Sequence, residues 1–308
     1  MPALLTAFCH CLLNMKSGFC TLWGRPNTGK STLLNALLGR KHVITSPRPQ
    51  TTRHRIAGVL HGAEEFQIVF LDTPGIHEPK HKLGETLVKN AQSALADVEC
   101  VVFVADATEV PHDDDRLATE GLKRVKAPVI LALNKVDAAK DLEGVRGAFK
   151  KLRPFDAVVG ISALTGEGLD SLTREIVARF PQGEPYFPPD MNGDRSTEFH
   201  LEELIREQAL LQLHAEIPHS IAVAIEQMAP RPNDRFYVEA IIYVERESQK
   251  KIVIGEGGAR IKEIGLKARV QIEEWLGKKV YLEVRVKVRD KWRDDDLWLS
   301  RFGIAERG

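Results

Sequence analysis

The sequence predicts an α/β domain with a mostly parallel sheet, followed by a smaller α+β domain. From Phe19 to about Phe180, short apolar runs alternate with longer helical patterns, which is typical of βαβ units. A Pro-rich segment follows, and beyond it the predicted elements change to the order αββααβ. The length of 308 residues fits two such domains.

Composition narrows the class of protein further. The 43 Lys and Arg balance the 43 Asp and Glu, which excludes a uniformly basic coat for nucleic acid but allows a local basic patch. A hydrophobic share of 43% and a charged share of 28% exclude collagen-like, disordered and disulfide-scaffold proteins. The cysteines form neither a disulfide framework nor a metal-ligand spacing, so we expect a reducing, cytoplasmic compartment. They are Cys9, Cys11, Cys20 and Cys100.

The chain begins with an apolar stretch, from Pro2 to Leu13, that is too short to span a bilayer. The stretch lacks the positive region and the small-residue cleavage site of a signal peptide. We expect Met15 to be the natural start and residues 1–14 to be a wrongly assigned extension. The alternative is a short disordered or interfacial tail. No other segment has the pattern of a transmembrane helix.

The first domain is predicted to cover residues 15–180. Its strands are expected at 19–23, 66–71, 100–105, 129–133 and 157–161. Its helices are expected at 30–38, 83–95, 114–125, 141–151 and 168–179. Residues 54–60 could add an edge strand beside 66–71. Pro and Gly crowd the start of the following segment and predict a semi-rigid linker over 181–196.

The second domain is predicted to cover residues 197–308, including a C-terminal tail. The expected elements are a helix at 197–213, strands at 220–227 and 235–245, a short helix or turn at 249–254, a loop at 255–258, a helix at 259–275 and a strand at 279–288. Apolar residues alternate along the last strand, as in a half-buried strand.

A phosphate-binding motif follows the first predicted strand and opens the first helix. Residues 24–31 fit G-x-x-x-x-G-K-[ST]. Glycines let backbone N–H groups point at phosphate oxygens, and the helix N-terminus adds a favourable dipole. Lys30 would neutralise the β- and γ-phosphates, and the Ser31 hydroxyl would ligate Mg²⁺. We expect nucleotide contacts from Gly24, Arg25, Pro26, Asn27, Thr28, Gly29, Lys30 and Ser31.

A second motif, Asp72-Thr73-Pro74-Gly75, ends the predicted strand 66–71. Asp72 is placed to hold Mg²⁺ through water. Gly75 can offer its N–H to the γ-phosphate, and Ile76 follows it. An ordinary turn that closes a strand is the alternative interpretation of this motif.

A third motif, Asn134-Lys135-Val136-Asp137, follows the strand 129–133 and indicates the base. The Asp137 carboxylate can accept hydrogen bonds from N1–H and the exocyclic amine of guanine. Adenine lacks both donors and would leave the carboxylate unpaired, which is costly. Asn134 would approach the other base edge and Lys135 would pack on the ring. Ser162-Ala163, after the next strand, would complete the pocket through a backbone N–H.

With these motifs in place, the first 180 residues resemble a translation-factor-type small GTPase domain. Pro26-Asn27, Gln50-Thr51-Thr52-Arg53-His54 and residues 72–75 resemble the Era branch in particular. The resemblance implies GTP and GDP with Mg²⁺ as ligands. It also implies that Thr51 and Thr52 lie in the first switch loop, where one Thr senses Mg²⁺ and the γ-phosphate. Which of the two does so is left open, and ordinary loop capping is the alternative.

Hydrolysis is expected to be slow. Many GTPases carry a Gln after the glycine of the second motif to orient the attacking water, and Ile76 stands there in this chain. The resemblance associates Asn27 with a potassium ion in the place of an arginine finger; alternatively Asn27 only shapes the loop. The groups expected to act in catalysis are Lys30, Thr51, Thr52 and Gly75.

The second domain carries G-x-x-G between two helical stretches and resembles a type II KH domain, which has the same αββααβ order. In that module the glycines let a nucleic-acid backbone approach, and a groove takes about four unstacked bases. From Glu245 to Arg293 there are 14 Lys and Arg against 8 Asp and Glu, a local excess that supports phosphate binding. The expected RNA contacts are Lys250, Lys251, Ile254, Gly255, Glu256, Gly257, Gly258, Arg260 and Lys262.

The combined resemblance to Era implies partners. These are the ribosomal small subunit and its RNA near the 3′ end, with a role in small-subunit maturation, and a peripheral contact with the cytoplasmic face of the cell membrane. We expect a monomer. Two alternatives stay open: a constitutive KH RNA-binding protein whose GTPase domain is regulatory or structural, and a GTPase acting on tRNA or at a membrane. Trp23 and Thr28 depart from the usual residues beside and within the phosphate loop.

Overall fold

The computed structural model describes residues 15–48, 51–62, 65–76, 78, 82–96, 98–191, 193–214 and 217–305. The expected extension, residues 1–14, and Gln50 lie outside the described residues. Packing separates the chain into two units. Unit 1 comprises the described residues of Met1–Val43, Thr52–Glu78 and Leu87–Asp194, and unit 2 those of Ile44–Thr51, Pro79–Thr86 and Arg195–Gly308. The limits of the two predicted domains and of the linker stay predictions.

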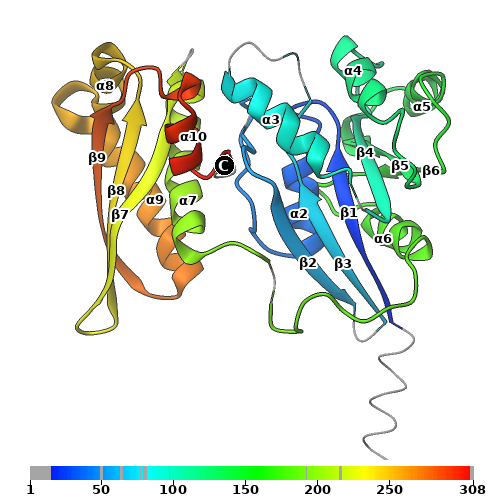
Figure 1. The fold of residues 1–308 in the computed structure, drawn as a ribbon, viewed down its shortest axis with the longest axis horizontal. Helices are drawn as coiled ribbons and strands as arrows, with labels where there is room; N and C mark the ends of the chain where they lie inside the picture. Colours follow the sequence, from blue (N-terminus) through cyan, green and yellow to red (C-terminus); the bar gives the residue numbers. More distant parts are fainter. Residues whose placement is uncertain are drawn as a thin grey trace, which may run out of the picture. The chain divides into compact units, whose positions relative to one another are not determined.

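Unit 1 is built on a six-stranded sheet in the order β2-β3-β1-β4-β5-β6 (Figure 1). The strands are β1 (Lys16–Trp23), β2 (Ile56–Gly62), β3 (Phe66–Asp72), β4 (Cys100–Asp106), β5 (Val129–Asn134) and β6 (Ala157–Ile161). Every neighbouring pair is parallel except β2 and β3, which are antiparallel. The predicted α/β class with a mostly parallel sheet is confirmed. The expected edge strand also exists, shifted by two residues.

The helices of this part of the chain are α2 (Lys30–Leu38), α3 (Lys82–Ser93), α4 (Asp113–Gly121), α5 (Leu142–Lys150) and α6 (Leu169–Ala178), with a 3-10 turn, η1 (Val136–Ala138). Helices α4 and α5 pack against β4 and β5 through an apolar cluster that includes Phe103, Leu122 and Phe149. Helix α4 ends four residues before the predicted end, because the chain from Leu122 forms turns. The central strands are buried on both faces, as parallel strands usually are.

Trp23, which is an unusual residue beside a phosphate loop, is fully buried in this cluster. Its indole N–H donates to the Ala118 carbonyl of α4 at 2.7 Å. Gly121 makes room for the ring, since a Cβ there would lie 2.8 Å from Trp23 Cζ2. The bulky side chain is therefore accommodated by a small residue on α4 and does not disturb the loop that follows it.

We expect Trp23→Phe to lower the free energy of unfolding of unit 1 by about 2 kcal/mol. The substitution leaves the buried Ala118 carbonyl without its donor and leaves space where the second ring was. Urea unfolding of the full chain, followed by circular dichroism, measures the change. Trp275→Phe is the matched control, because Trp275 is 39% exposed and should shift the transition by less than about 0.5 kcal/mol.

Much of the predicted linker lies on unit 1. The buried Gln67 of β3 accepts from the Tyr186 and Phe187 N–H groups at 2.7 and 3.0 Å and donates to the Phe187 carbonyl at 2.8 Å. The Tyr186 ring lies 4.6 Å from that of Phe19. Asp194 accepts from the Ala57 N–H at 3.1 Å. These contacts hold the Pro-rich segment against β1, β2 and β3 up to Asp194.

Unit 2 contains the predicted αββααβ order. Its elements are α7 (Thr197–Gln212), η2 (Ile217–Ser220), β7 (Ala222–Arg231), β8 (Arg235–Val244), α8 (Glu247–Ile254), η3 (Glu256–Gly258), α9 (Ala259–Leu276), β9 (Lys279–Val288), η4 (Trp292–Asp294) and α10 (Asp296–Arg301). The sheet order is β7-β8-β9, with β7 antiparallel and β9 parallel to β8. The α+β class and the type II KH arrangement are confirmed.

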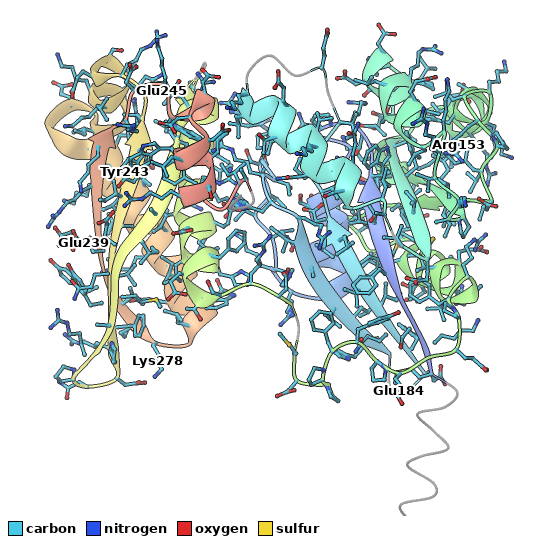
Figure 2. The ribbon with its side chains drawn as sticks, viewed as in Figure 1. Arg153, Glu184, Glu239, Tyr243, Glu245 and Lys278 are labelled. Atoms are coloured by element: carbon cyan, nitrogen blue, oxygen red, sulfur yellow. The ribbon has the colours of Figure 1, made fainter. Side chains whose placement is uncertain are left out.

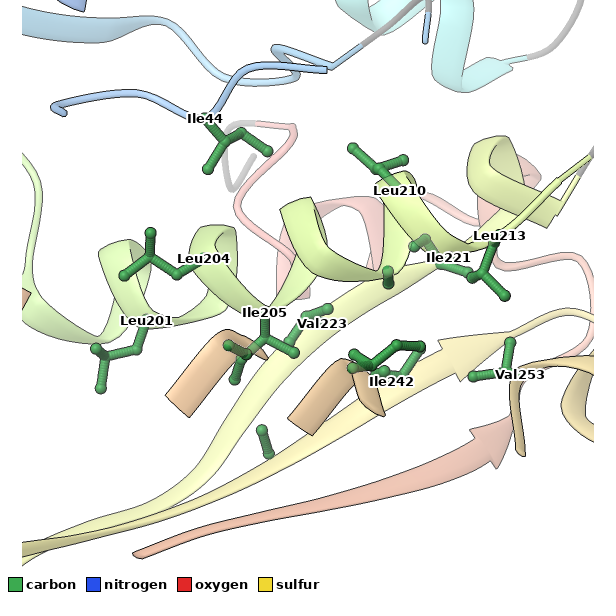
Figure 3. Packing of buried hydrophobic residues seen from close by; sticks show 14 of the residues in the cluster. Ile44, Leu201, Leu204, Ile205, Leu210, Leu213, Ile221, Val223, Ile242 and Val253 are labelled. Atoms are coloured by element: carbon green, nitrogen blue, oxygen red, sulfur yellow. The ribbon is translucent and has the colours of Figure 1, made fainter. Parts of the chain in front are cut away.

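The core of unit 2 lies between α7, α9 and one face of the sheet (Figure 3). Leu201, Ile205 and Ile242 are among its fully buried members. Ile44, from the segment 44–51, packs in the same cluster. Alternation along β8 and β9 places apolar side chains on this face and leaves the other face polar, as expected for a half-buried sheet.

Strand β7 differs from the prediction because it continues to Arg231, through Pro230. A proline lacks the N–H that a central strand needs, but β7 is an edge strand and tolerates it. A register shift between Ile225 and Gln227 absorbs one residue. The hairpin then closes through Asn233 and Asp234, both with positive φ.

The C-terminal part, expected to be a tail, forms η4 and α10. Trp292 is fully buried and its indole N–H donates to the Ser220 carbonyl at 2.9 Å, as expected for a core residue. Trp298 lies 5.3 Å from the Tyr243 ring on the polar side of the sheet. In the part of the chain that the structure describes, no helix combines the length and apolarity needed to cross a membrane.

Candidate functional site

The predicted motifs meet at one edge of the unit 1 sheet. The phosphate loop follows β1, Asp72 ends β3, Asn134 ends β5 and Ser162 follows β6. These strands are parallel, so their carboxyl ends lie at the same edge. This is the place where open α/β sheets bind their ligands.

The backbone of the phosphate loop requires glycine at its two ends. Gly24 has a φ of 145° and a Cβ there would lie 2.5 Å from the Val104 carbonyl oxygen. Gly29, with a φ of 94°, caps α2, and its Cβ would lie 2.3 Å from Asn134 Nδ2. Asn27 also has positive φ, at 64°. Such turns point successive N–H groups inward and form an anion-binding nest at the helix N-terminus.

Lys30 is buried inside this loop. Its ammonium group donates to the Gly24 and Arg25 carbonyls at 3.0 and 2.7 Å. Burial lowers the pKa of Lys30 to about 8, against the opposing effect of Asp72. Phosphate oxygens brought to the loop would favour the charged form, so the lysine is poised for a strongly anionic ligand.

Three oxygen-bearing side chains converge beside the loop. Ser31 Oγ lies 2.9 Å from Thr52 Oγ1, and both hydroxyls lie 3.1 Å from Asp72 Oδ2. The second oxygen, Asp72 Oδ1, is buried and lacks a hydrogen-bond partner among the residues that the structure describes. Burial raises the pKa of Asp72, although Lys30 and the two hydroxyls oppose the change. A buried, half-satisfied carboxylate among hydroxyls fits a hard cation such as Mg²⁺.

The two candidate threonines of the first switch loop lie differently. Thr52 contributes its hydroxyl to this oxygen cluster. The Thr51 hydroxyl instead donates to the Arg48 carbonyl at 2.7 Å, the local capping that was the alternative interpretation. The geometry therefore favours Thr52 as the residue that contacts a metal ion.

The second motif closes over the phosphate loop through its backbone. The Ile76 N–H donates to the Gly24 carbonyl at 3.1 Å, and a Cβ on Gly75 would lie 2.7 Å from the Pro26 nitrogen. The Thr73 hydroxyl donates to the Leu22 carbonyl at 2.8 Å. The Ile76 side chain packs in the same apolar cluster as Trp23. It is therefore in no position to orient a water molecule.

The third motif connects three loops. Asn134 is buried; its Nδ2 donates to the Thr28 carbonyl at 2.8 Å, and its Oδ1 accepts from the Lys135 and Ala163 N–H groups, each at 2.9 Å. This role in fixing the loops was not expected, and the contact of Asn134 with the base edge stays a prediction. The carboxylate of Asp137 is exposed, in the turn that follows. Ser162 is fully buried and accepts from the Thr165 N–H at 3.2 Å.

Two acidic residues that position basic side chains of this site were not predicted from the sequence. Asp106, at the end of β4, pairs with Lys135. Burial alone would raise the pKa of Asp106, but the hydrogen bonds from Lys135 and Thr108 outweigh it and lower the pKa. Arg25 likewise lies 3.0 Å from the buried Asp115 of α4. Asp106 could have been found from its place at a strand end; Asp115 looks like an ordinary surface helix residue.

Unit 2 holds the segment that leads into Thr52. Buried Glu207 of α7 accepts from the Thr45 N–H at 2.9 Å. Buried Arg206 donates to the Thr51 carbonyl and is held by Glu203 at 2.6 Å. Residues 44–51 are therefore fastened to α7 at both ends, and the next residue, Thr52, belongs to the oxygen cluster of unit 1.

The expected RNA-binding loop lies between α8 and α9. Its glycines at 255, 257 and 258 all have positive φ, and a Cβ on Gly257 or Gly258 would meet none of the described residues within 4 Å. Lys251, Glu256 and Lys262 are exposed around the loop, whereas Lys250 and Ile254 are half-buried. Arg260 is half-buried and donates to the Ile252 carbonyl at 2.6 Å. The loop therefore presents open backbone flanked by positive charge.

Comparison with known proteins agrees with both units. The family model for 50S ribosome-binding GTPases matches residues 19–135, and that for KH domains matches residues 216–293. GTPase Era from Alkaliphilus metalliredigens is 46% identical over 294 residues, which cover 94% of this chain and 99% of that protein. The chain belongs to the Era family. GTPase Era from Carboxydothermus hydrogenoformans is 43% identical and covers 96% of the chain.

Solved Era structures match over the same span. Era in complex with MgGDPNP and nucleotides 1506–1542 of 16S ribosomal RNA has a TM-score of 0.91 and 40% identity, covering 94% of this chain and 99% of that one. A variant of Aquifex aeolicus Era bound to GDP·AlF4⁻ also has a TM-score of 0.91, with 41% identity. The predicted resemblance to the Era branch is confirmed, and this family member is a GTPase.

Proposed function

We propose that this protein is a GTP-binding, slowly hydrolysing switch that binds small-subunit ribosomal RNA near its 3′ end and assists assembly of the small subunit. The observation that carries the proposal is the likeness over nearly the whole chain to Era bound to MgGDPNP and a 16S ribosomal RNA fragment. The nucleotide site and the open loop of unit 2 supply the two binding surfaces that such a role needs.

GTP and GDP would be bound by the phosphate loop, by the turn 72–76 and by residues 134–137 with Ser162 and Ala163. Ser31, Thr52 and Asp72 would hold Mg²⁺, which when bound neutralises charge on the β- and γ-phosphates. Lys30 orients the same phosphates and Gly75 offers its N–H. The Ile76 side chain supplies no group for the attacking water, which supports a slow intrinsic rate. The potassium ion expected beside Asn27 stays a prediction, and comparing hydrolysis in potassium and sodium salts tests it.

The nucleotide state would reach the RNA-binding domain through residues 44–51. Contact of Thr52 with Mg²⁺ would move the peptide that joins it to Thr51. Arg206 holds the carbonyl of that same peptide, and α7 carries Arg206 into the core of the KH domain. Because the buried Arg206 is itself paired with Glu203, a movement of Thr51 cannot be absorbed by a loose side chain. This contact supports the switch over a constitutive RNA-binding protein.

The RNA assignment is tested at the loop. We expect Gly257→Asp to weaken binding of a single strand from the small-subunit ribosomal RNA 3′ end at least tenfold and to leave GTP binding unchanged. Asp tolerates positive φ better than most residues and meets open space here, but adds a negative charge where phosphates approach. Fluorescence anisotropy at fixed salt gives the affinities.

Gly39→Asp is the matched control, since Gly39 also has positive φ and a Cβ there would meet none of the described residues within 4 Å, but it caps the end of α2 in unit 1. Equal losses in the two variants would contradict a specific role for the loop. Competition by tRNA in the same titration distinguishes the proposal from a GTPase that acts on tRNA.

A cytoplasmic location is also part of the proposal. Cys20 and Cys100, the cysteines that the structure describes, are free and buried, which fits the reducing compartment. Peripheral contact with the cytoplasmic face of the membrane, and a monomeric state, stay predictions. Co-sedimentation with anionic vesicles and sedimentation velocity test them.

A further inference from the structure

The polar face of the unit 2 sheet is only partly covered. Near the ends of β8 and β9, the rings of α10 and its flank pack on it: Trp298 and Phe302 lie 5.3 and 5.4 Å from Tyr243. The opposite end, beside the β7–β8 turn and Lys278, carries no such cover among the described residues (Figure 2). Three rows of side chains point outward there. Each row consists of residues that are direct partners on neighbouring strands.

The middle of these rows is aromatic. Tyr237 of β8 and Tyr281 of β9 are direct cross-strand partners, and their rings are stacked with centroids 5.8 Å apart and planes inclined by 14°. The Arg231 guanidinium lies over Tyr237, 5.0 Å from the ring centre. Tyr281, on the edge strand, is 66% exposed. The pair therefore offers an exposed ring, that of Tyr281, on which a further planar ring can stack.

The outer row is basic. Arg231, Arg235 and Lys279 follow one another across the three strands, and all are exposed. Lys279 also pairs with Glu273 at 3.0 Å. The inner row is acidic, but Arg285 lies 3.1 Å from Glu239 and 2.7 Å from Glu283.

The Tyr237 hydroxyl, 3.2 Å from Glu283, links the acidic row to the aromatic one. Glu283 therefore helps to hold the Tyr237 side chain in place. Arg285 neutralises much of the negative charge of the acidic row.

We propose that this end of the sheet is a second RNA contact, in which an unpaired base stacks on Tyr281 and its phosphates meet the basic row. Stacked aromatic rings beside exposed Arg and Lys have the chemistry of a single-strand platform, and the charge is complementary to phosphate. Tyr281 lies seven residues, or about 23 Å, along β9 from Val288, whose partner Val244 on β8 precedes α8. The inference rests on the proposed RNA-binding function and adds a contact outside the glycine loop.

The test compares two single strands from the small-subunit ribosomal RNA 3′ end: one of about four nucleotides, which fits a KH groove, and one of roughly 12 nucleotides, which can reach the platform. We expect Tyr281→Ala to weaken the longer strand about tenfold, the loss of one stacked base, and to leave the short strand unchanged. Tyr281→Phe should restore binding, because it keeps the ring.

A second measurement does not depend on Tyr281. The variant with both Arg231→Gln and Arg235→Gln should bind the longer strand with a shallower dependence of log affinity on log salt, by about one unit. The inference is overturned if the longer strand binds Tyr281→Ala within twofold of wild type, or if the short strand loses as much. If the wild-type protein binds neither strand, the proposed RNA-binding function itself fails. This outcome can be distinguished from the two outcomes that overturn only the second contact.

Discussion

Asp137→Asn is expected to lower the affinity for GTP about 100-fold and to raise the affinity for xanthosine triphosphate. The exposed carboxylate can accept from both N1–H and the exocyclic amine of guanine, and two hydrogen bonds to a charged group are worth about 3 kcal/mol together. An Asn offers one acceptor and one donor. Its amide N–H₂ would face an amine in guanine but a carbonyl oxygen in xanthine.

Asp141→Asn is the matched control for this change. Asp141 caps α5 by accepting from the Gly144 N–H, a role that Asn performs as well, and it lies outside the motif. Its nucleotide affinities should equal those of the wild type in a competition titration. An unchanged preference for guanine in Asp137→Asn would contradict the assignment of the base pocket.

Thr52→Ala should reduce the rate of GTP hydrolysis about 100-fold, the loss expected when a metal site loses a ligand or its close support. The hydroxyl lies within 3.1 Å of Asp72 Oδ2 and 2.9 Å of Ser31 Oγ. If Thr52 is the switch threonine, as proposed, removing the hydroxyl would take one oxygen from the group of Ser31, Thr52 and Asp72 that would hold Mg²⁺. Single-turnover hydrolysis at saturating GTP, with the Mg²⁺ concentration varied, measures the rate constant of hydrolysis and its dependence on Mg²⁺.

Thr51→Ala is the matched control for Thr52→Ala. Its hydroxyl donates to Arg48 within the loop, and only its carbonyl, which Ala retains, reaches Arg206. We expect a loss smaller than fivefold. A larger loss in Thr51→Ala than in Thr52→Ala would reverse the assignment of the switch threonine.

Local patterns predicted the fold and the positions of the motifs well. The phosphate loop, the turn at Asp72 and the motif at Asn134 are short stretches whose neighbours are fixed by strand ends, so their positions follow from a parallel sheet. The αββααβ order could be predicted because each helix or strand has its own periodicity. Helix α10 was missed because six residues are too few to show a helical period.

Contacts between distant residues could not be predicted. Trp23 fits only because Gly121 leaves space for it, and nothing near Trp23 in the sequence indicates that. The base contact expected of Asn134 stays a prediction, whereas the pattern gave no sign that its amide joins the phosphate loop to the loop after β6. Arg206 and Glu207 have the pattern of ordinary charged helix residues. Their role depends on a segment more than 150 residues earlier.

The central claim is that the bound nucleotide sets the affinity for RNA. The most direct test is a titration of a single-stranded oligonucleotide from the small-subunit ribosomal RNA 3′ end into the full chain, loaded first with GDP and then with a non-hydrolysable GTP analogue, at one fixed salt concentration. We predict at least a tenfold difference between the two affinities, which is about 1.4 kcal/mol of coupling. Equal, tight binding in both states would contradict the claim and mean that the KH domain binds RNA independently of the nucleotide.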